Sequence, residues 1–115
     1  MNISKTLIID DEQDICLLLQ NFFRKRNAEA VFSLTLKDGL KKFETLKPNL
    51  VILDHNLPDG FGIEQISGLK KKDPAISVIV ISAMSNLEVK ALEHGADFFI
   101  AKPISFTQLN TIIAS

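Results

Sequence analysis

A chain of 115 residues has the length of one ordinary domain and leaves no room for a second of normal size. Hydrophobic residues make up 46% of the chain and charged residues 23%, which argues against disorder. The chain has 13 Lys and Arg and 14 Asp and Glu, so it lacks the basic excess that is typical of nucleic-acid-binding proteins. The single cysteine excludes an intramolecular disulfide, and apolar runs of at most five residues exclude a membrane-spanning segment. Because the sequence shows no secretory signal, we expect a cytoplasmic protein.

Short apolar runs predict five β-strands. The last three contain almost no polar residue, as is typical of strands that are buried on both faces of a parallel sheet. The runs cover residues 6–9, 30–32, 50–53, 78–81 and 98–101.

Segments with helical spacing lie between and after these runs. Two four-residue signatures, Ser85 to Glu88 and Ser105 to Gln108, predict capping boxes at the start of the last two helices. The apolar faces that the spacing predicts are Ile15, Leu18, Leu19, Phe22 and Phe23; Leu36, Leu40 and Phe43; Ile63, Ile66 and Leu69; Val89 and Leu92; and Leu109, Ile112 and Ile113.

Five strand–helix units in succession predict an α/β fold, a parallel sheet with helices on both faces and right-handed crossovers. In open sheets of this kind, functional residues lie beyond the carboxyl ends of the strands. The strand ends are therefore where chemistry is expected.

Polar residues follow four of the five predicted strands. Asp10, Asp11 and Glu12 come after the first, Asp54 after the third, Ser82 after the fourth and Lys102 after the fifth. Three close carboxylates repel one another unless a cation intervenes, and oxygen ligands without His or Cys suit Mg²⁺ or Mn²⁺. Asp10, Asp11 and Asp54 with Lys102 and one divalent ion would be electrically neutral. Such a site suits phosphoryl transfer, with Ser82 as a hydroxyl donor and one carboxylate as the nucleophile.

Each of these residues also has a simpler interpretation. Asp11 with Asp14 could cap the first helix, Asp54 could belong to a turn, Ser82 could cap the fourth helix, and Lys102 could be a solvated surface lysine. These interpretations are reasonable one at a time. They do not explain why all four residues fall at carboxyl strand ends of the same fold.

Four stretches of sequence carry a resemblance to a known family. The stretches are IIDDE, LVILDHNLPDGFG, VIVISA and GADFFIAKP. In this order and spacing they resemble the receiver domain of two-component response regulators, over residues 5–113. The resemblance implies a flavodoxin-like doubly wound sheet of five parallel strands in the order 2-1-3-4-5. One receiver domain is expected over residues 1–115, with no output domain in these residues.

The resemblance also implies roles for particular residues. Asp54 matches the phospho-acceptor, and Asp10 and Asp11 match the acidic pair that holds Mg²⁺ together with Asp54 and the backbone carbonyl of Asn56. Ser82 and Lys102 match the residues that bind the phosphoryl group. The remaining matches are Phe99 at the aromatic switch position, Asn56 and Met84 at positions that tune phosphate lifetime, and Pro103, expected after a cis bond.

A phosphorylation-activated switch is the function that the resemblance implies, rather than a turnover enzyme. A histidine kinase or a phosphotransfer protein would donate the phosphoryl group, and the fourth helix, fifth strand and fifth helix would relay the change to an effector domain or protein, or to a phosphorylation-dependent dimer. No direct contact with nucleic acid or membrane is expected.

Three alternative functions compete with this one. A phosphohydrolase with an aspartyl nucleophile would need an acid at residue 56, where Asn56 stands. A flavin-binding module would need a phosphate-binding loop after the first strand, where the acids would repel phosphate. The strongest alternative is a receiver-like interaction module that acts without phosphorylation.

Other residues receive structural interpretations. His55 is expected to lie in a loop or to face a partner, and His94 to interact with the last turn of a helix. Cys16 lies just off the predicted apolar face of the first helix, and we expect it to be a packing thiol.

Overall fold

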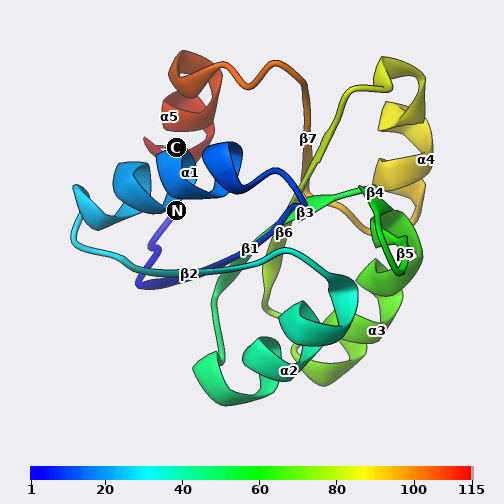
Figure 1. Cartoon of the computed structure of the whole chain (residues 1–115), viewed down its shortest axis with the longest axis horizontal. Helices are drawn as coiled ribbons and strands as arrows, with labels where there is room; N and C mark the ends of the chain where they lie inside the picture. Colours follow the sequence, from blue (N-terminus) through cyan, green and yellow to red (C-terminus); the bar gives the residue numbers. More distant parts are fainter. Residues whose placement is uncertain (115) are drawn as a thin grey trace.

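The main sheet has five parallel strands, as expected. The computed structural model describes residues 1–114 (Figure 1). The strand order is β2-β1-β3-β6-β7, which is the order 2-1-3-4-5 once a small hairpin is set apart. The strands are β1 (Lys5–Ile9), β2 (Glu29–Ser33), β3 (Leu50–Asp54), β6 (Ser77–Ser82) and β7 (Phe98–Ala101), so each predicted apolar run forms a strand.

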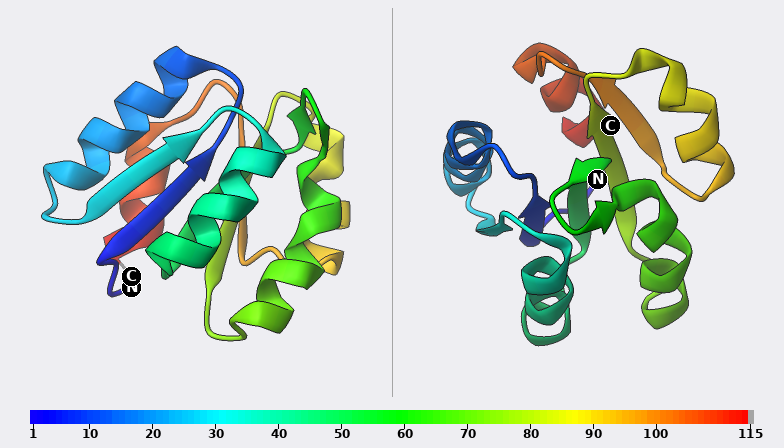
Figure 2. Two further views of the ribbon diagram at one scale, coloured as in Figure 1. Left: turned by 60° about the horizontal axis from the view of Figure 1, so that its bottom comes forward. Right: turned by 45° about the vertical axis from the view of Figure 1, so that its right-hand side comes forward.

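Five α-helices cover the two faces of the sheet (Figure 2). They are α1 (Gln13–Arg24), α2 (Leu36–Leu46), α3 (Ile66–Lys72), α4 (Glu88–Glu93) and α5 (Phe106–Ala114). Successive side chains of a strand point to opposite faces, and in β3 both sets are apolar because both faces are covered. One core lies under α1 and α5 and includes Leu19 and Leu109. The other lies under α2, α3 and α4 and includes Phe43 and Leu69.

The expected face of α4 is wrong, and the expected face of α1 is right except at one residue. In α1, Leu19, Phe22 and Phe23 are buried and Ile15 packs against the core, as predicted. Leu18 is 58% exposed, and Cys16, just off the predicted face, is fully buried. In α4, Val89 and Leu92 are exposed and only Ala91 is buried. A run of five apolar residues in α1 allows more than one buried face, and the sheet determines which face is used.

The two predicted capping boxes have different outcomes. Ser105 does cap α5, because its hydroxyl accepts the backbone N–H of Gln108 at 3.1 Å. Ser85 does not cap α4. It lies in the 3₁₀ turn η2 (Ser85–Leu87) that precedes this helix, and the N-cap position of that turn, Met84, makes no side-chain cap bond.

A small antiparallel hairpin that was not predicted follows the third strand of the sheet. It consists of β4 (Asn56–Leu57) and β5 (Gly60–Phe61), and the 3₁₀ turn η1 (Gly62–Gln65) leads from it into α3. The sequence predicts a turn over these residues. It does not predict the strand pairing, because strands of only two residues leave no recognisable pattern. The hairpin lies directly after Asp54, so it borders the carboxyl edge of the sheet.

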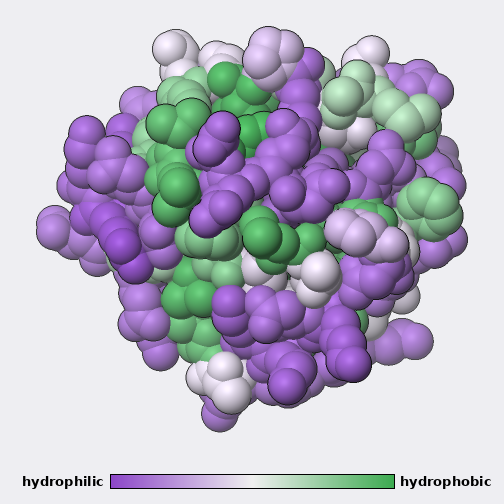
Figure 3. All heavy atoms as spheres, in the orientation of Figure 1, coloured by the Kyte–Doolittle hydropathy of each residue, from purple (hydrophilic) through white to green (hydrophobic). Residues whose placement is uncertain are grey.

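Among residues 1–114, none of the helices combines the length and the apolar character that a bilayer-spanning segment requires. On the face shown in Figure 3, hydrophilic residues cover most of the surface, and hydrophobic residues gather mainly in a band left of the centre.

Candidate functional site

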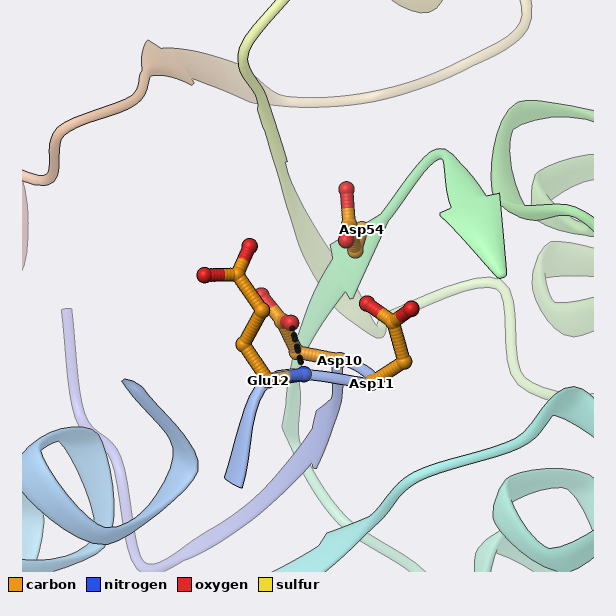
Figure 4. A group of neighbouring side chains, drawn as sticks. All are labelled: Asp10, Asp11, Glu12 and Asp54. Carbon is orange, nitrogen blue, oxygen red and sulfur yellow. Dashed lines mark hydrogen bonds between the residues drawn. The ribbon is translucent and has the colours of Figure 1, made fainter. Parts of the chain in front are cut away.

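Four acidic side chains meet at the carboxyl edge of the sheet. Asp10 follows β1, Asp11 and Glu12 lead into α1, and Asp54 is the last residue of β3 (Figure 4). Each side chain has an oxygen within 4.8 Å of one from every other. Asp10 is fully buried and Asp54 is 5% exposed, whereas Asp11 and Glu12 are exposed at the rim. The parallel register causes this convergence, because β1 and β3 are neighbours and end at the same edge.

The backbone after β1 is held by the side chain of Asp10. Its Oδ1 accepts the N–H of Glu12 at 2.8 Å, which directs the chain into α1. The simpler interpretation of Asp11 and Asp14 as a helix cap does not hold, because the N-cap residue of α1 is Glu12 and its side chain makes no cap hydrogen bond. Asp10 therefore both shapes this loop and presents its second oxygen to the acidic group.

Lys102 is the cation of the site. Its Nζ lies 3.0 Å from Asp10, 2.8 Å from Glu12 and 3.1 Å from Asp54, and its side chain is only 10% exposed. The backbone N–H of Lys102 donates to the carbonyl of Ser82, and the bond to Pro103 is cis, as expected. Lys102 is therefore not a solvated surface lysine, and one ammonium group faces three carboxylates.

The electrostatics of the site follow from this imbalance. Burial, followed by the charge of Asp10, raises the pKa of Asp54 to about 6. Burial also raises the pKa of Asp10. Burial alone would lower the pKa of Lys102, but its hydrogen bonds to Glu12 and Asp10 and the charge of Asp54 outweigh this and raise the pKa. The site thus holds more negative charge than its lysine balances, and it consists of hard oxygen donors that fit a divalent cation such as Mg²⁺ or Mn²⁺.

These pKa directions predict how the stability of the metal-free protein depends on pH. Because the folded pKa of Asp54 lies above the unfolded value, the contribution of Asp54 to the free energy of unfolding should fall as pH rises through about 4 to 6. Asp54→Asn removes this buried charge and should raise the free energy of unfolding by about 1–3 kcal/mol at pH 8, and by less at pH 5.

Urea unfolding in a chelating buffer at both pH values measures this difference. Asp38→Asn is the matched control, because Asp38 is an exposed acid whose pKa is lowered by hydrogen bonds to Ser33 and Lys42. It should show no gain. A loss of stability in Asp54→Asn at pH 8 would contradict the prediction.

Ser82 lies at the end of β6, beside the acidic group. It is 1% exposed, and its hydroxyl accepts the backbone N–H of Met84 at 3.0 Å. The side chain of Met84 in turn contacts Asn56, whose Nδ2 lies 3.6 Å from the Met84 sulfur. The structure therefore brings together Asn56 and Met84, two positions 28 residues apart for which the resemblance implies the same role.

Phe99 lies on β7 and is 8% exposed, inside the core under α4. The aromatic switch position that the resemblance implies is therefore occupied by a ring that is already buried in this structure.

His55 lies in the bend between β3 and β4, as the predicted loop position requires, but it is buried and does not face a partner. His55 is 6% exposed, its Nδ1 accepts the N–H of Ile63 at 3.3 Å, and its ring stacks on Phe61 with 5.1 Å between centroids. Burial lowers its pKa. The hairpin folds back over the residue after Asp54, and these contacts with Phe61 and Ile63 give His55 a structural role.

Cys16 and His94 have the predicted structural roles. The Cys16 thiol is fully buried, donates to the carbonyl of Asp10 at 3.2 Å, and has a pKa raised to about 12 by burial. His94 ends α4, where its Nδ1 lies 2.8 Å from the carbonyl of Lys90.

Sequence reasoning missed two residues of the site. Glu12 was noted among the acids but given no role, although it makes the shortest contact to Lys102. Gly62 donates its N–H to the carbonyl of His55 at 2.7 Å, and a Cβ at this position would lie 2.0 Å from the carbonyl oxygen of Asp54. The glycine that ends the motif LVILDHNLPDGFG was the only available signal of this close approach.

Comparisons with known proteins agree with this geometry. A family model described as "Response regulator receiver domain" matches residues 6–114. The chain is 35% identical over 104 residues to the chemotaxis protein CheY of Listeria monocytogenes, covering 86% of each. It is 39% identical over 108 residues to the KDP operon transcriptional regulatory protein KdpE of Escherichia coli, covering 92% of this chain and 48% of that protein. The chain thus spans about half the length of KdpE.

A solved structure has the same fold. The receiver domain protein (CheY-like) of Methanospirillum hungatei superimposes with a TM-score of 0.89 at 30% identity, covering 98% of this chain and 92% of that one.

Proposed function

The chain belongs to the family of response regulator receiver domains, and from this premise we propose that it is a signalling switch controlled by phosphorylation of Asp54. One observation carries the proposal. The carboxylate of Asp54 lies at a strand end, 3.1 Å from the Lys102 ammonium and within the acidic group. This is where an incoming phosphoryl group would meet both a nucleophile and a cation.

We propose Mg²⁺, with Mn²⁺ as a substitute, as the cofactor. Asp10, Asp11, Asp54 and the backbone carbonyl of Asn56 would hold it, and the fit rests on the uncompensated carboxylates of this group. When bound, the ion would neutralise negative charge on the carboxylates and on the phosphoryl oxygens.

The proposed reaction transfers one phosphoryl group between two side chains. A carboxylate oxygen of Asp54 attacks the phosphorus of a phosphohistidine in line, an O–P bond forms, the P–N bond breaks, and its electron pair returns to the imidazole. Lys102 lies beside the attacking carboxylate and offsets the charge of the phosphoryl oxygens. The donor is a histidine kinase or a histidine phosphotransfer protein.

The phosphorylated state differs from the resting state in charge and in hydrogen bonding. Phosphorylation adds about one unit of negative charge and three acceptor oxygens at Asp54. Ser82 would exchange its bond to the Met84 N–H for a bond to the phosphoryl group, which frees the start of η2. The change would shift an existing equilibrium of η2, α4 and Phe99.

We propose that the switch is read on the surface formed by α4, β7 and α5. The exposed apolar side chains of Met84, Val89 and Leu92 support this, because they lie on α4 or just before it and fill no core in this chain. The partner would be an effector domain or protein, or a second phosphorylated copy, and no direct binding to nucleic acid is proposed. The site would undergo phosphorylation and dephosphorylation without multiple turnover, in the cytoplasm.

Intact mass after incubation with Mg²⁺ and acetyl phosphate tests the proposal. The wild-type chain should gain one phosphoryl adduct, Asp54→Asn should gain none, and the matched control Asp38→Asn should behave as wild type. No adduct, together with no Mg²⁺-dependent binding of beryllium fluoride, would instead support an interaction module that acts without phosphorylation. Many phosphate esters hydrolysed per chain would support a phosphohydrolase.

A further inference from the structure

The tip of the β4–β5 hairpin is fastened to the beginning of α2. Asp59, in the turn of the hairpin, accepts two backbone N–H groups with its two carboxylate oxygens. Oδ1 accepts from Leu36 at 2.8 Å and Oδ2 from Lys37 at 2.9 Å. Figure 2 shows the hairpin beside the N-terminal end of α2 in its left view.

Asp59 accepts two N-terminal N–H groups of α2 that the local cap residue, Thr35, leaves without an acceptor. The N-terminal N–H groups of a helix have no partner within the helix. Thr35 satisfies one of them, since its hydroxyl accepts the N–H of Asp38 at 3.1 Å. The N–H groups of Leu36 and Lys37 would need water without Asp59. The hydrogen bonds from Lys37 and Leu36, of which that from Lys37 has the larger effect, lower the pKa of Asp59. The carboxylate is therefore charged at neutral pH, and it faces the positive end of the helix dipole.

The hairpin depends on such anchors. It has only two pairs of facing residues, Asn56 with Phe61 and Leu57 with Gly60. Isolated two-stranded hairpins are marginally stable even when longer. At its base, the N–H of Gly62 donates to the carbonyl of His55 at 2.7 Å. At its tip, the bonds of Asp59 to α2 are the corresponding attachment.

We propose that Asp59 is a positioning residue for the divalent-cation site. By fastening the tip of the hairpin to α2, it holds the backbone at residue 56, which is the carbonyl ligand in the proposed function on which this inference rests. Asp59 itself is not a member of the acidic group, so it acts through the backbone that it holds. The same contact joins α2 to the loop that follows the phospho-acceptor.

Asp59→Ala should weaken Mg²⁺ binding by the unphosphorylated protein about tenfold, which is the scale on which groups that orient metal ligands act. Isothermal titration calorimetry with Mg²⁺ alone measures the affinity. In the metal-free protein, amide hydrogen exchange at Leu36 and Lys37 should quicken in the same variant, because both N–H groups lose their acceptor.

Two control variants separate positioning from general stability. Asp73→Ala removes another turn carboxylate, a half-buried one that accepts the N–H of Ala75 at 3.1 Å in the turn between α3 and β6, away from the site. Thr35→Ala removes the local cap of α2 but leaves both bonds of Asp59 in place. Both controls should bind Mg²⁺ as wild type does.

Each outcome bears on the inference. Wild-type Mg²⁺ affinity in Asp59→Ala would overturn it, and so would an equal loss in Thr35→Ala, which would make Asp59 a helix cap only. If the wild-type chain binds Mg²⁺ but accepts no phosphoryl group at Asp54, the proposed function fails while the comparison of affinities still decides the role of Asp59. A wild-type chain that binds no Mg²⁺ would overturn both.

Discussion

Replacing Lys102 with methionine is expected to lower the free energy of unfolding of the metal-free protein by about 3–5 kcal/mol at pH 8, the scale for breaking a buried ion pair. The ammonium of Lys102 lies within 3.1 Å of carboxylate oxygens from Asp10, Glu12 and Asp54, and the side chain is 10% exposed. Methionine keeps most of the volume and removes the charge. The buried carboxylates then have no cation beside them.

The pH dependence of this loss follows from the carboxylates. Asp54 already has a pKa raised to about 6, and removal of the lysine should raise it further, so the loss should shrink near pH 5 as the carboxyl protonates. Mg²⁺ should restore part of the stability at pH 8, because it binds the folded state and compensates the same groups. Urea unfolding followed by far-ultraviolet circular dichroism, with and without chelator, measures both effects.

Lys72→Met is the matched control for this experiment. Lys72 pairs with Glu44 between α3 and α2, but both side chains are at least half exposed, at 50% and 58%. Exposed ion pairs contribute about 0–1 kcal/mol, so the control should lose little. If Lys102→Met were no more destabilising than Lys72→Met, the account of Lys102 as the balancing charge would be wrong.

Gly62→Ala is expected to destabilise the protein by about 2 kcal/mol or more, at the upper end for overpacked sites. The new Cβ would lie 2.0 Å from the carbonyl oxygen of Asp54 and 3.0 Å from Cγ of Leu53. The first of these is a backbone atom, so no rotamer change relieves the contact. The hairpin must move away from β3, which also breaks the bond from Gly62 to the carbonyl of His55.

A second glycine provides the control. Gly68 lies inside α3, and a Cβ there would meet no atom within 4 Å. Gly68→Ala should therefore stabilise the helix by about 0.5–1 kcal/mol, the difference in helix propensity. Thermal unfolding of both variants, with the phosphoryl adduct as a second readout, tests the pair. Equal stability of Gly62→Ala and wild type would show that the loop tolerates a side chain at this position.

Patterns within short segments predicted most of the fold. The central strands β3 and β6 are buried on both faces, and such strands must be apolar throughout, which is visible in four consecutive residues of each. The rule that parallel strands bring their carboxyl ends to one edge then placed Asp10, Asp54 and Lys102 together. The edge of the buried face of α1 was not predictable in this way. Cys16, Leu17 and Leu18 are consecutive and apolar, so their pattern alone does not show that Cys16 is buried and Leu18 exposed.

The sequence by itself determined the fold class, the edge at which the site forms and the residue types that meet there, because these depend on local hydrophobic patterns and on strand order. The tertiary structure decided which residues contact one another across the chain. Lys102 reaches Glu12 across 90 residues of chain, Asp59 reaches Leu36 across 23, and His55 is buried by the hairpin that follows it. Such contacts depend on how folded elements pack against one another, and packing distances of a few ångströms are not encoded in the spacing of residues along one segment.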